Sequence, residues 1–160
     1  MKKVLFLLAL IMPILFCSCG DEKDEPNNKS GIYEAPYLGW GDSFETLKAK
    51  CKQTFIKVDY SGYLFKGKDN IDYHYEFYNG GLDAVYLDLP YEFKAIDVIL
   101  DYFKSNYVYK GKGNDSSTDY YFVSKDGKLG IVIFDEHSRG QQIHYFDYNN
   151  PRYFYLHYGS

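Results

Sequence analysis

One stretch of the chain occurs twice with the same spacing of turn and strand residues. Residues 72–88, DYHYEFYNGGLDAVYLD, align without a gap on residues 119–135, DYYFVSKDGKLGIVIFD. Each stretch places an Asn-Gly or Asp-Gly pair between runs of aromatic and β-branched residues, and that pattern is typical of a β-hairpin. Self-similarity of this kind constrains the fold, because each copy is expected to form the same supersecondary unit.

A helical pattern precedes each hairpin. Both patterns space their apolar residues three or four positions apart, so that these residues share one face of a helix. A capping box formed by Asp42 and Glu45 indicates the start of the first helix, and Pro90 favours the start of the second. The apolar positions are Phe44, Leu47, Cys51 and Phe55 in the first copy and Phe93, Ile96, Ile99, Leu100 and Phe103 in the second.

A helix, a strand and a hairpin in each copy predict an α+β fold. We expect a duplicated αβββ unit, with repeats at about residues 43–89 and 91–136, whose two helices pack on one face of an antiparallel sheet. A C-terminal strand pair is expected within residues 141–158, around the turn sequence NNPR at 149–152. All of these elements are predicted to belong to a single domain over residues 32–160.

Composition supports one core rich in aromatic rings. The chain has 160 residues, of which 20% are aromatic, a length that suits one domain. Its formal net charge is −4. Nucleic-acid binding depends on cations clustered at phosphates, so we expect no nucleic-acid partner.

The register of the two hairpins predicts which residues face the helices. A two-residue loop at Asn79 and Gly80 would place alternate residues of the flanking strands on the same face. The expected core face carries Tyr73, Tyr75, Phe77, Leu82, Ala84 and Tyr86 in the first copy and Tyr120, Phe122, Leu129, Ile131 and Ile133 in the second.

The opposite face is expected to mix polar and apolar groups. Such a surface favours an interaction site if it is open, and it is ordinary packing if the tether, the Trp40 segment or the C-terminal strands cover it. Trp40 itself, the only Trp, could anchor a partner or could pack the chain onto the first helix. The candidate partner-binding residues are Trp40, His74, Val85, Leu87, Tyr121, Val132 and Phe134.

The N-terminus has the pattern of an export signal. Lys2 and Lys3 precede an apolar run over residues 4–16, which is too short to span a membrane and is typical of a signal peptide. The sequence FCSC that follows resembles the lipobox of bacterial lipoproteins, with Ser18 as the small residue before the acylated cysteine. The resemblance implies a signal peptide at residues 1–18 and a lipid, such as palmitate, on Cys19.

Residues 19–31 are predicted to form an acidic, flexible tether. Acid-rich stretches directly after the lipid cysteine resemble the surface-export signal of lipoproteins in the Bacteroidetes. The resemblance implies a protein attached to the outer membrane by its lipid and facing the cell surface. A tether that faces the periplasm is the alternative.

The predicted order of elements over roughly residues 43–148 also resembles two known folds. These are the β-lactamase-inhibitor-protein-like fold and the fold of outer-membrane-assembly lipoproteins of the SmpA/OmlA type. This resemblance rests on element order alone, and it implies a binding module without assigning a target.

The sequence contains no recognisable catalytic motif. The four histidines, at 74, 137, 144 and 157, lack the spacing of a zinc helix, and the acids near residues 135–137 are expected to be solvated charges. Cys51 is expected to pack in the core. We therefore predict no catalytic residue, no metal and no cofactor.

The resulting hypothesis is a non-catalytic, lipid-anchored envelope protein that binds a protein or a glycan. Binding would use the open sheet face or the aromatic C-terminal strands. One alternative is a small envelope hydrolase that uses His74, Glu76 and Asp83. Another is a structural lipoprotein in outer-membrane assembly.

Overall fold

The computed structural model describes residues 32–58, 60, 62–113, 118–136 and 140–156. The predicted signal peptide, Cys19 and the tether lie outside these residues. Among the described residues, no helix is both long enough and apolar enough to cross a membrane.

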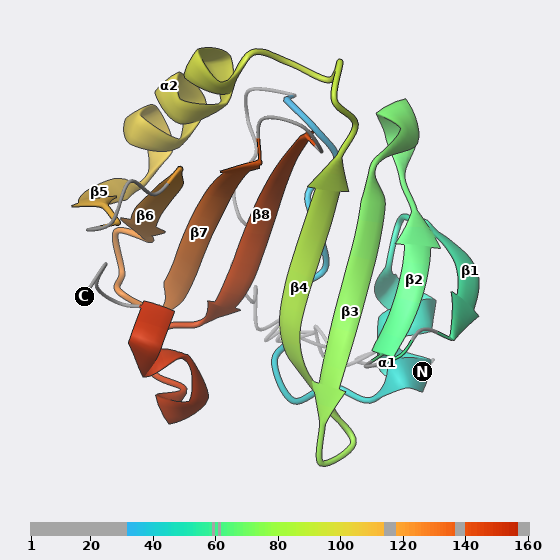
Figure 1. The fold of residues 1–160 in the computed structure, drawn as a ribbon. Coiled ribbons are helices and arrows are strands. Elements are labelled where there is room, and N and C mark those ends of the chain that lie inside the picture. The colour runs from blue at the N-terminus through green and yellow to red at the C-terminus, as the bar shows by residue number, and fades with distance from the viewer. Residues whose placement is uncertain (1–31, 59, 61, 114–117, 137–139, 157–160) are drawn as a thin grey trace, which may run out of the picture.

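The strands form one eight-stranded antiparallel sheet with the order β1-β2-β3-β4-β8-β7-β6-β5 (Figure 1). The predicted α+β class is therefore confirmed. The order of elements is α1 (Phe44–Lys50), β1 (Thr54–Val58), β2 (Gly62–Lys66), η1 (Lys68–Asn70), β3 (Asp72–Tyr78), β4 (Gly81–Leu89), α2 (Ile96–Asn106), β5 (Val108–Lys112), β6 (Asp119–Val123), β7 (Leu129–Glu136), β8 (Gly140–Asp147) and η2 (Pro151–Leu156). Each helix precedes four strands in the chain, whereas each repeat was expected to contain three. The two runs of four strands meet where β4 pairs with β8.

The first helix is shorter than its apolar periodicity predicts. Ser43, rather than Asp42, caps it by accepting a hydrogen bond from the backbone N–H of Thr46. The helix ends at Lys50, because Cys51 has an extended backbone with ψ of 134°. Phe55 therefore lies in β1, where its ring packs edge-on against Phe44 and Phe65 rather than continuing a helical stripe.

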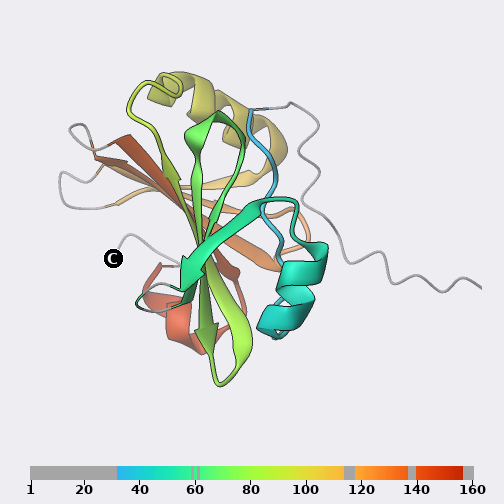
Figure 2. The same ribbon diagram turned by 90° about the vertical axis from the view of Figure 1, so that its right-hand side faces the viewer.

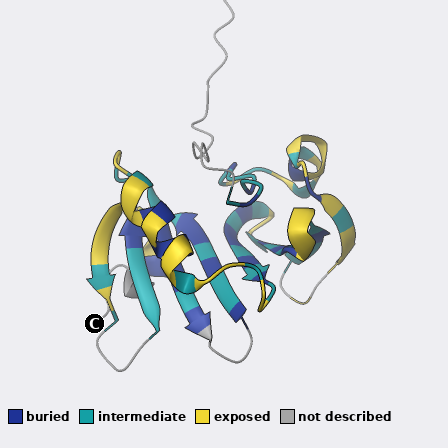
Figure 3. Cartoon of the chain, turned by 90° about the horizontal axis from the view of Figure 1, so that it is seen from above, coloured by how far each residue is buried: buried dark blue, intermediate teal, exposed yellow. Residues whose placement is uncertain are grey.

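The second helix matches its predicted apolar positions more closely. It begins at Ile96, six residues after Pro90, and it buries Ile99, Leu100 and Phe103. Buried and exposed residues alternate around α2 (Figure 3). This distribution is that of an amphipathic helix whose apolar side faces the core.

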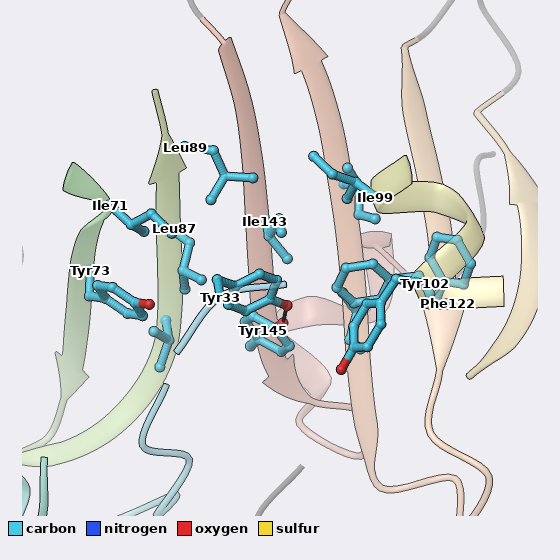
Figure 4. Packing of buried hydrophobic residues seen from close by; sticks show 14 of the residues in the cluster. Tyr33, Ile71, Tyr73, Leu87, Leu89, Ile99, Tyr102, Phe122, Ile143 and Tyr145 are labelled. Carbon is cyan, nitrogen blue, oxygen red and sulfur yellow. Dashed lines mark hydrogen bonds between the residues drawn. The ribbon is translucent and has the colours of Figure 1, made fainter. Parts of the chain in front are cut away.

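The main core cluster joins residues from both helices and the sheet. Figure 4 shows the part of it formed by Ile99 and Tyr102 of α2 and by strand residues such as Leu87 and Ile143. Leu47 of α1 and Phe103 of α2 belong to it together with strand residues such as Tyr73 and Ile143. The extended segment before α1 contributes Tyr33, whose hydroxyl group is hydrogen-bonded to that of Tyr145. Figure 2 shows α1 and η2 on opposite sides of the sheet.

A β-bulge changes the predicted register of the first hairpin. Phe77 pairs with Leu82 as expected, but the next pair is Glu76 with Ala84, so that Asp83 is an extra residue in β4. Every later residue of β4 is consequently turned to the other face. The prediction that Val85 and Leu87 lie on the face away from the helices is wrong.

Both residues are fully buried in the main core cluster, where Val85 pairs with Tyr75 and Leu87 pairs with Tyr73. Ala84 and Tyr86 lie on the other face instead, packed in a second, smaller cluster. In the second hairpin the predicted pairs are correct, with Phe122 opposite Ile131 and Tyr120 opposite Ile133.

The C-terminal strand pair is only half present. Residues 140–147 form β8, but the second expected strand is replaced by the 3₁₀ helix η2. The physical reason is the position of β8 in the sheet. β4 and β7 pair with its two edges, so no edge is left for a strand that follows it.

The bulged register predicts that truncation of the Leu87 side chain strongly destabilises the protein. We expect Leu87→Ala to lower the free energy of unfolding by about 2–5 kcal/mol, because it leaves a cavity in the main core. The measurement is urea unfolding. Val98→Ala, at an exposed position of α2, is the control and should change stability by less than about 0.5 kcal/mol. Equal effects of the two substitutions would contradict this register.

Candidate functional site

The face of the sheet that carries η2 is called the second face here. Residues that pair in register form two continuous rows across it. Most of these side chains are half-buried. The first row contains Leu64, His74, Tyr86, His144, Val132 and Tyr121, and the second contains Lys66, Asp72, Asp88, Gln142, Phe134 and Asp119.

One end of the second face is covered by η2. The ring of Tyr153 packs on Phe146 with 5.4 Å between ring centroids, and both side chains are buried with Ala84 and Val132. Phe146 in turn lies over Gly130, where a Cβ atom would meet its ring at 2.2 Å. A larger residue at position 130 would therefore displace the ring of Phe146 and, with it, the ring of Tyr153.

Asp83, the extra residue of the bulge, attaches η2 to the sheet. Its carboxylate accepts hydrogen bonds from the Tyr153 hydroxyl at 2.6 Å and from the Asn150 side-chain amide at 2.9 Å. Arg152 Nε lies 3.2 Å from the same carboxylate, and its guanidinium lies 3.6 Å from the centroid of the Tyr78 ring. Cover by the C-terminal segment, one of the alternatives raised by the sequence, is thus found at this end of the face.

A polar network occupies the part of the face beyond η2. Asp88 is its centre, with His74 Nε2 at 2.9 Å from one carboxylate oxygen and Gln142 Nε2 at 2.7 Å from the other. The Gln142 amide is thereby oriented with its Oε1 towards His144 Nε2, 3.4 Å away. Next to the network, Lys66 and Asp72 form an ion pair of 2.7 Å.

Two rings flank the imidazole of His144. Tyr86 meets it edge-on at 4.2 Å and Phe134 lies at 4.5 Å, measured between ring centroids. Burial disfavours the charged form and lowers the pKa of His144 to about 4. His144 is therefore neutral at pH 7. Hydrogen bonding from His74 lowers the pKa of Asp88, which remains a carboxylate.

The residues named in the hydrolase hypothesis each contact a side chain of the second face or of η2. His74 contacts Asp88, Glu76 accepts a hydrogen bond from the Tyr86 hydroxyl at 2.8 Å, and Asp83 binds η2. Within the described ranges, no group of three His, Cys, Asp or Glu side chains could hold a metal ion.

Cys51 shows no sign of activation as a nucleophile. Its thiol donates to Gln53 Oε1 at 2.8 Å, and burial raises its pKa. A raised pKa keeps the group as a thiol at neutral pH, whereas a nucleophilic cysteine needs the thiolate. The side chain is partly buried against the main core, as expected.

The structure places the candidate residues in three environments. His74, Tyr121, Val132 and Phe134 lie on the second face, although Val132 is fully buried there. Val85 and Leu87 lie in the main core, and Trp40 packs against it.

Sequence reasoning missed four residues of the site: Tyr86, Asp88, Gln142 and His144. The unbulged register expected from the sequence places Tyr86 in the core, whereas the bulge turns it to the second face. Gln142 and His144 alternate with buried Ile143 and Tyr145 along β8, so their shared face could have been read from that alternation. The proximity of Tyr86 and Asp88 to these two residues could not be predicted, because the pairing of β8 with β4 is a long-range contact.

No protein-family model, curated protein or solved structure matches this chain. The comparisons therefore assign no family, and functional argument depends on the chain's own residues.

The buried, neutral imidazole of His144 predicts a pH dependence of stability. The unfolded chain binds a proton near pH 6.5, whereas the folded protein binds it only near pH 4. The unfolded state is therefore favoured as the pH falls through this window. Between pH 6.5 and pH 4 we expect the free energy of unfolding to fall by as much as about 3 kcal/mol, and by less to the extent that solvent reaches the ring.

The measurement is urea unfolding at a series of pH values, with His144→Gln as the comparison. In the His144→Gln variant, the free energy of unfolding should depend much less on pH between 6.5 and 4. In the His74→Gln variant, the part of the pH dependence that comes from His144 should remain. An NMR titration of His144 with a midpoint near 6.5 would contradict the prediction.

Proposed function

We propose that this protein is a non-catalytic, lipid-anchored binding protein of a bacterial envelope, whose ligand lies across the uncovered part of the second face. The supporting observation is the network of His74, Asp88, Gln142 and His144. These polar groups are oriented by one another beside the rings of Tyr86 and Phe134. Pre-oriented groups of this kind lower the cost of ordering on binding.

The chemistry of this surface fits a glycan better than a folded protein. The centres of protein interfaces are depleted of charged residues. Here the Lys66–Asp72 ion pair and the contact between His74 and the Asp88 carboxylate lie on β2, β3 and β4, and their side chains are between 29% and 42% exposed. Carboxylate, amide and imidazole groups can exchange hydrogen bonds with sugar hydroxyls, and adjacent aromatic rings can pack against the apolar side of a sugar.

We also propose that the domain arose by duplication of one helix-plus-sheet unit. Support comes from the alignment of residues 72–88 with residues 119–135 and from the same order of elements in both halves. In this proposal each unit has four strands rather than three, with both helices covering the main core. Joining the units through β4 and β8 produces the wide surface on which the ligand lies.

The proposed anchor is the lipid on Cys19, and the proposed location is the outer membrane with the domain at the cell surface. Cys19→Ala should abolish metabolic labelling with palmitate and release the protein from membranes. Cys17→Ala is the matched control and should keep the label. Loss of the label from the Cys17 variant alone would move the anchor to Cys17.

Protease treatment of intact cells tests the orientation. The domain should be digested while a periplasmic marker stays intact. Protection of a domain that is digested after lysis would instead place it in the periplasm, where a role in envelope assembly fits better.

Glycan binding should depend on the rings of the second face. A panel of host and plant polysaccharides, screened by isothermal titration with the chain that starts at Gly20, should contain a ligand. Tyr121→Ala combined with Phe134→Ala should weaken its binding about 5- to 150-fold, because each ring contact contributes about 0.5–1.5 kcal/mol. Tyr60→Ala combined with Tyr91→Ala removes two exposed rings elsewhere and should leave binding unchanged. Unaltered binding by the Tyr121 and Phe134 variant would place the ligand elsewhere.

A further inference from the structure

The charges of this chain are unevenly distributed. Residues 44–70 contain six lysines and three acidic residues, whereas the rest of the chain contains twelve basic and nineteen acidic residues. The segment around α1, β1 and β2 thus has a net charge of +3, and the remainder has −7. Such a separation orients the molecule in an external field, with α1 and the first two strands towards negative charge.

Exposed apolar side chains lie in the same segment. Ile56 is 50% exposed, Val58 is 70% exposed and Tyr60 is fully exposed, and they are among the most exposed large apolar residues described. All three belong to β1 or to the turn that follows it. Lys57 lies between them, and Lys48 of α1 extends over the ring of Phe55 in β1, with Nζ 5.6 Å from the ring centroid. These five residues, Lys48, Ile56, Lys57, Val58 and Tyr60, are called the β1 edge below.

The geometry of this edge is unfavourable for pairing with another strand. β1 is the first strand of the sheet and pairs with β2 alone. Its register shifts between Phe55 and Lys57, which makes it bulged. A bulge and a charged side chain on an edge strand both oppose the addition of a further strand. The apolar residues of the β1 edge therefore call for a different partner.

We propose that the β1 edge docks on an anionic lipid surface. Lysine ammonium groups would bind lipid phosphates, while the apolar side chains between them enter the boundary between headgroups and acyl chains. The net −7 of the remaining chain is repelled by the same surface, so only one orientation of the domain is favourable.

The chain that precedes the domain is long enough for this contact. The thirteen residues from Cys19 to Gly31 span at most about 45 Å when fully extended. A lipid on Cys19 would therefore hold the domain within reach of the bilayer. This argument from length rests on the proposed anchor, whereas the charge and the exposed apolar residues do not.

Sedimentation with vesicles tests the β1 edge without the anchor. The chain that starts at Gly20 lacks the lipid and keeps every described residue. It should bind vesicles of phosphatidylcholine mixed with phosphatidylglycerol, should not bind phosphatidylcholine alone, and should be released by salt. Lys48→Gln combined with Lys57→Gln should lower the partition coefficient about 30-fold, because each lysine near an anionic surface contributes about 1 kcal/mol.

The matched control is Lys94→Gln combined with Lys104→Gln. These lysines are also exposed, and each lies over an aromatic ring as Lys48 does, but they flank or belong to α2. The control should bind vesicles like the unaltered chain. Val58→Ser combined with Tyr60→Ser leaves the net charge of the chain unchanged and should still lower binding to the anionic vesicles. Circular dichroism should show that all of the variants are folded.

Three results would overturn the proposal. They are failure to bind anionic vesicles, equal losses in the Lys48/Lys57 and Lys94/Lys104 variants, and a dimer in light scattering that Val58→Ser dissociates. The last result would identify a second copy of the chain as the partner. None of these outcomes bears on ligand binding at the second face, because no glycan or lipid anchor is present in the assay.

Discussion

The extra residue in β4, Asp83, is the constraint on which most of the structure depends. Because a strand alternates its side chains between two faces, one inserted residue exchanges the faces of all that follow. Val85 and Leu87 thereby enter the main core, and Tyr86 and Asp88 join the second face. The carboxylate of Asp83 then holds η2 over one end of that face.

A core built from tyrosines needs partners for hydroxyl groups as well as apolar contacts. The hydroxyl of Tyr73 donates to the backbone oxygen of Glu34 at 2.6 Å, and that of Tyr75 accepts a hydrogen bond from the backbone N–H of Tyr37 at 3.2 Å. Tyr145 is hydrogen-bonded to Tyr33. These bonds attach the segment before α1 to the sheet. The aromatic composition thus stabilises a chain segment that has no regular secondary structure of its own.

The sheet separates two surfaces with different chemistry. On the second face, polar groups satisfy one another in a network of ion pairs and hydrogen bonds, and that order suits recognition of a ligand with hydroxyl groups. At the β1 edge, Lys57 of the bulged strand and Lys48 of α1 lie near exposed apolar residues, which suits an anionic interface. The two surfaces come from different elements, because the network lies on β3, β4 and β8 and the β1 edge on α1, β1 and the residues after it.

The sequence by itself determined the local features of this protein. Its repeated Asn-Gly and Asp-Gly turns predicted two hairpins, its apolar spacing predicted a helix before each, and the second hairpin has the expected register. Tertiary structure alone decided the bulge at Asp83, the end of α1 before Phe55, and the enclosure of β8 between β4 and β7. These depend on pairing between residues distant in the chain, which periodicity within one segment does not encode. For the same reason the network of His74, Asp88, Gln142 and His144 could not be assembled from the sequence, because its members come from three strands joined only in the folded sheet.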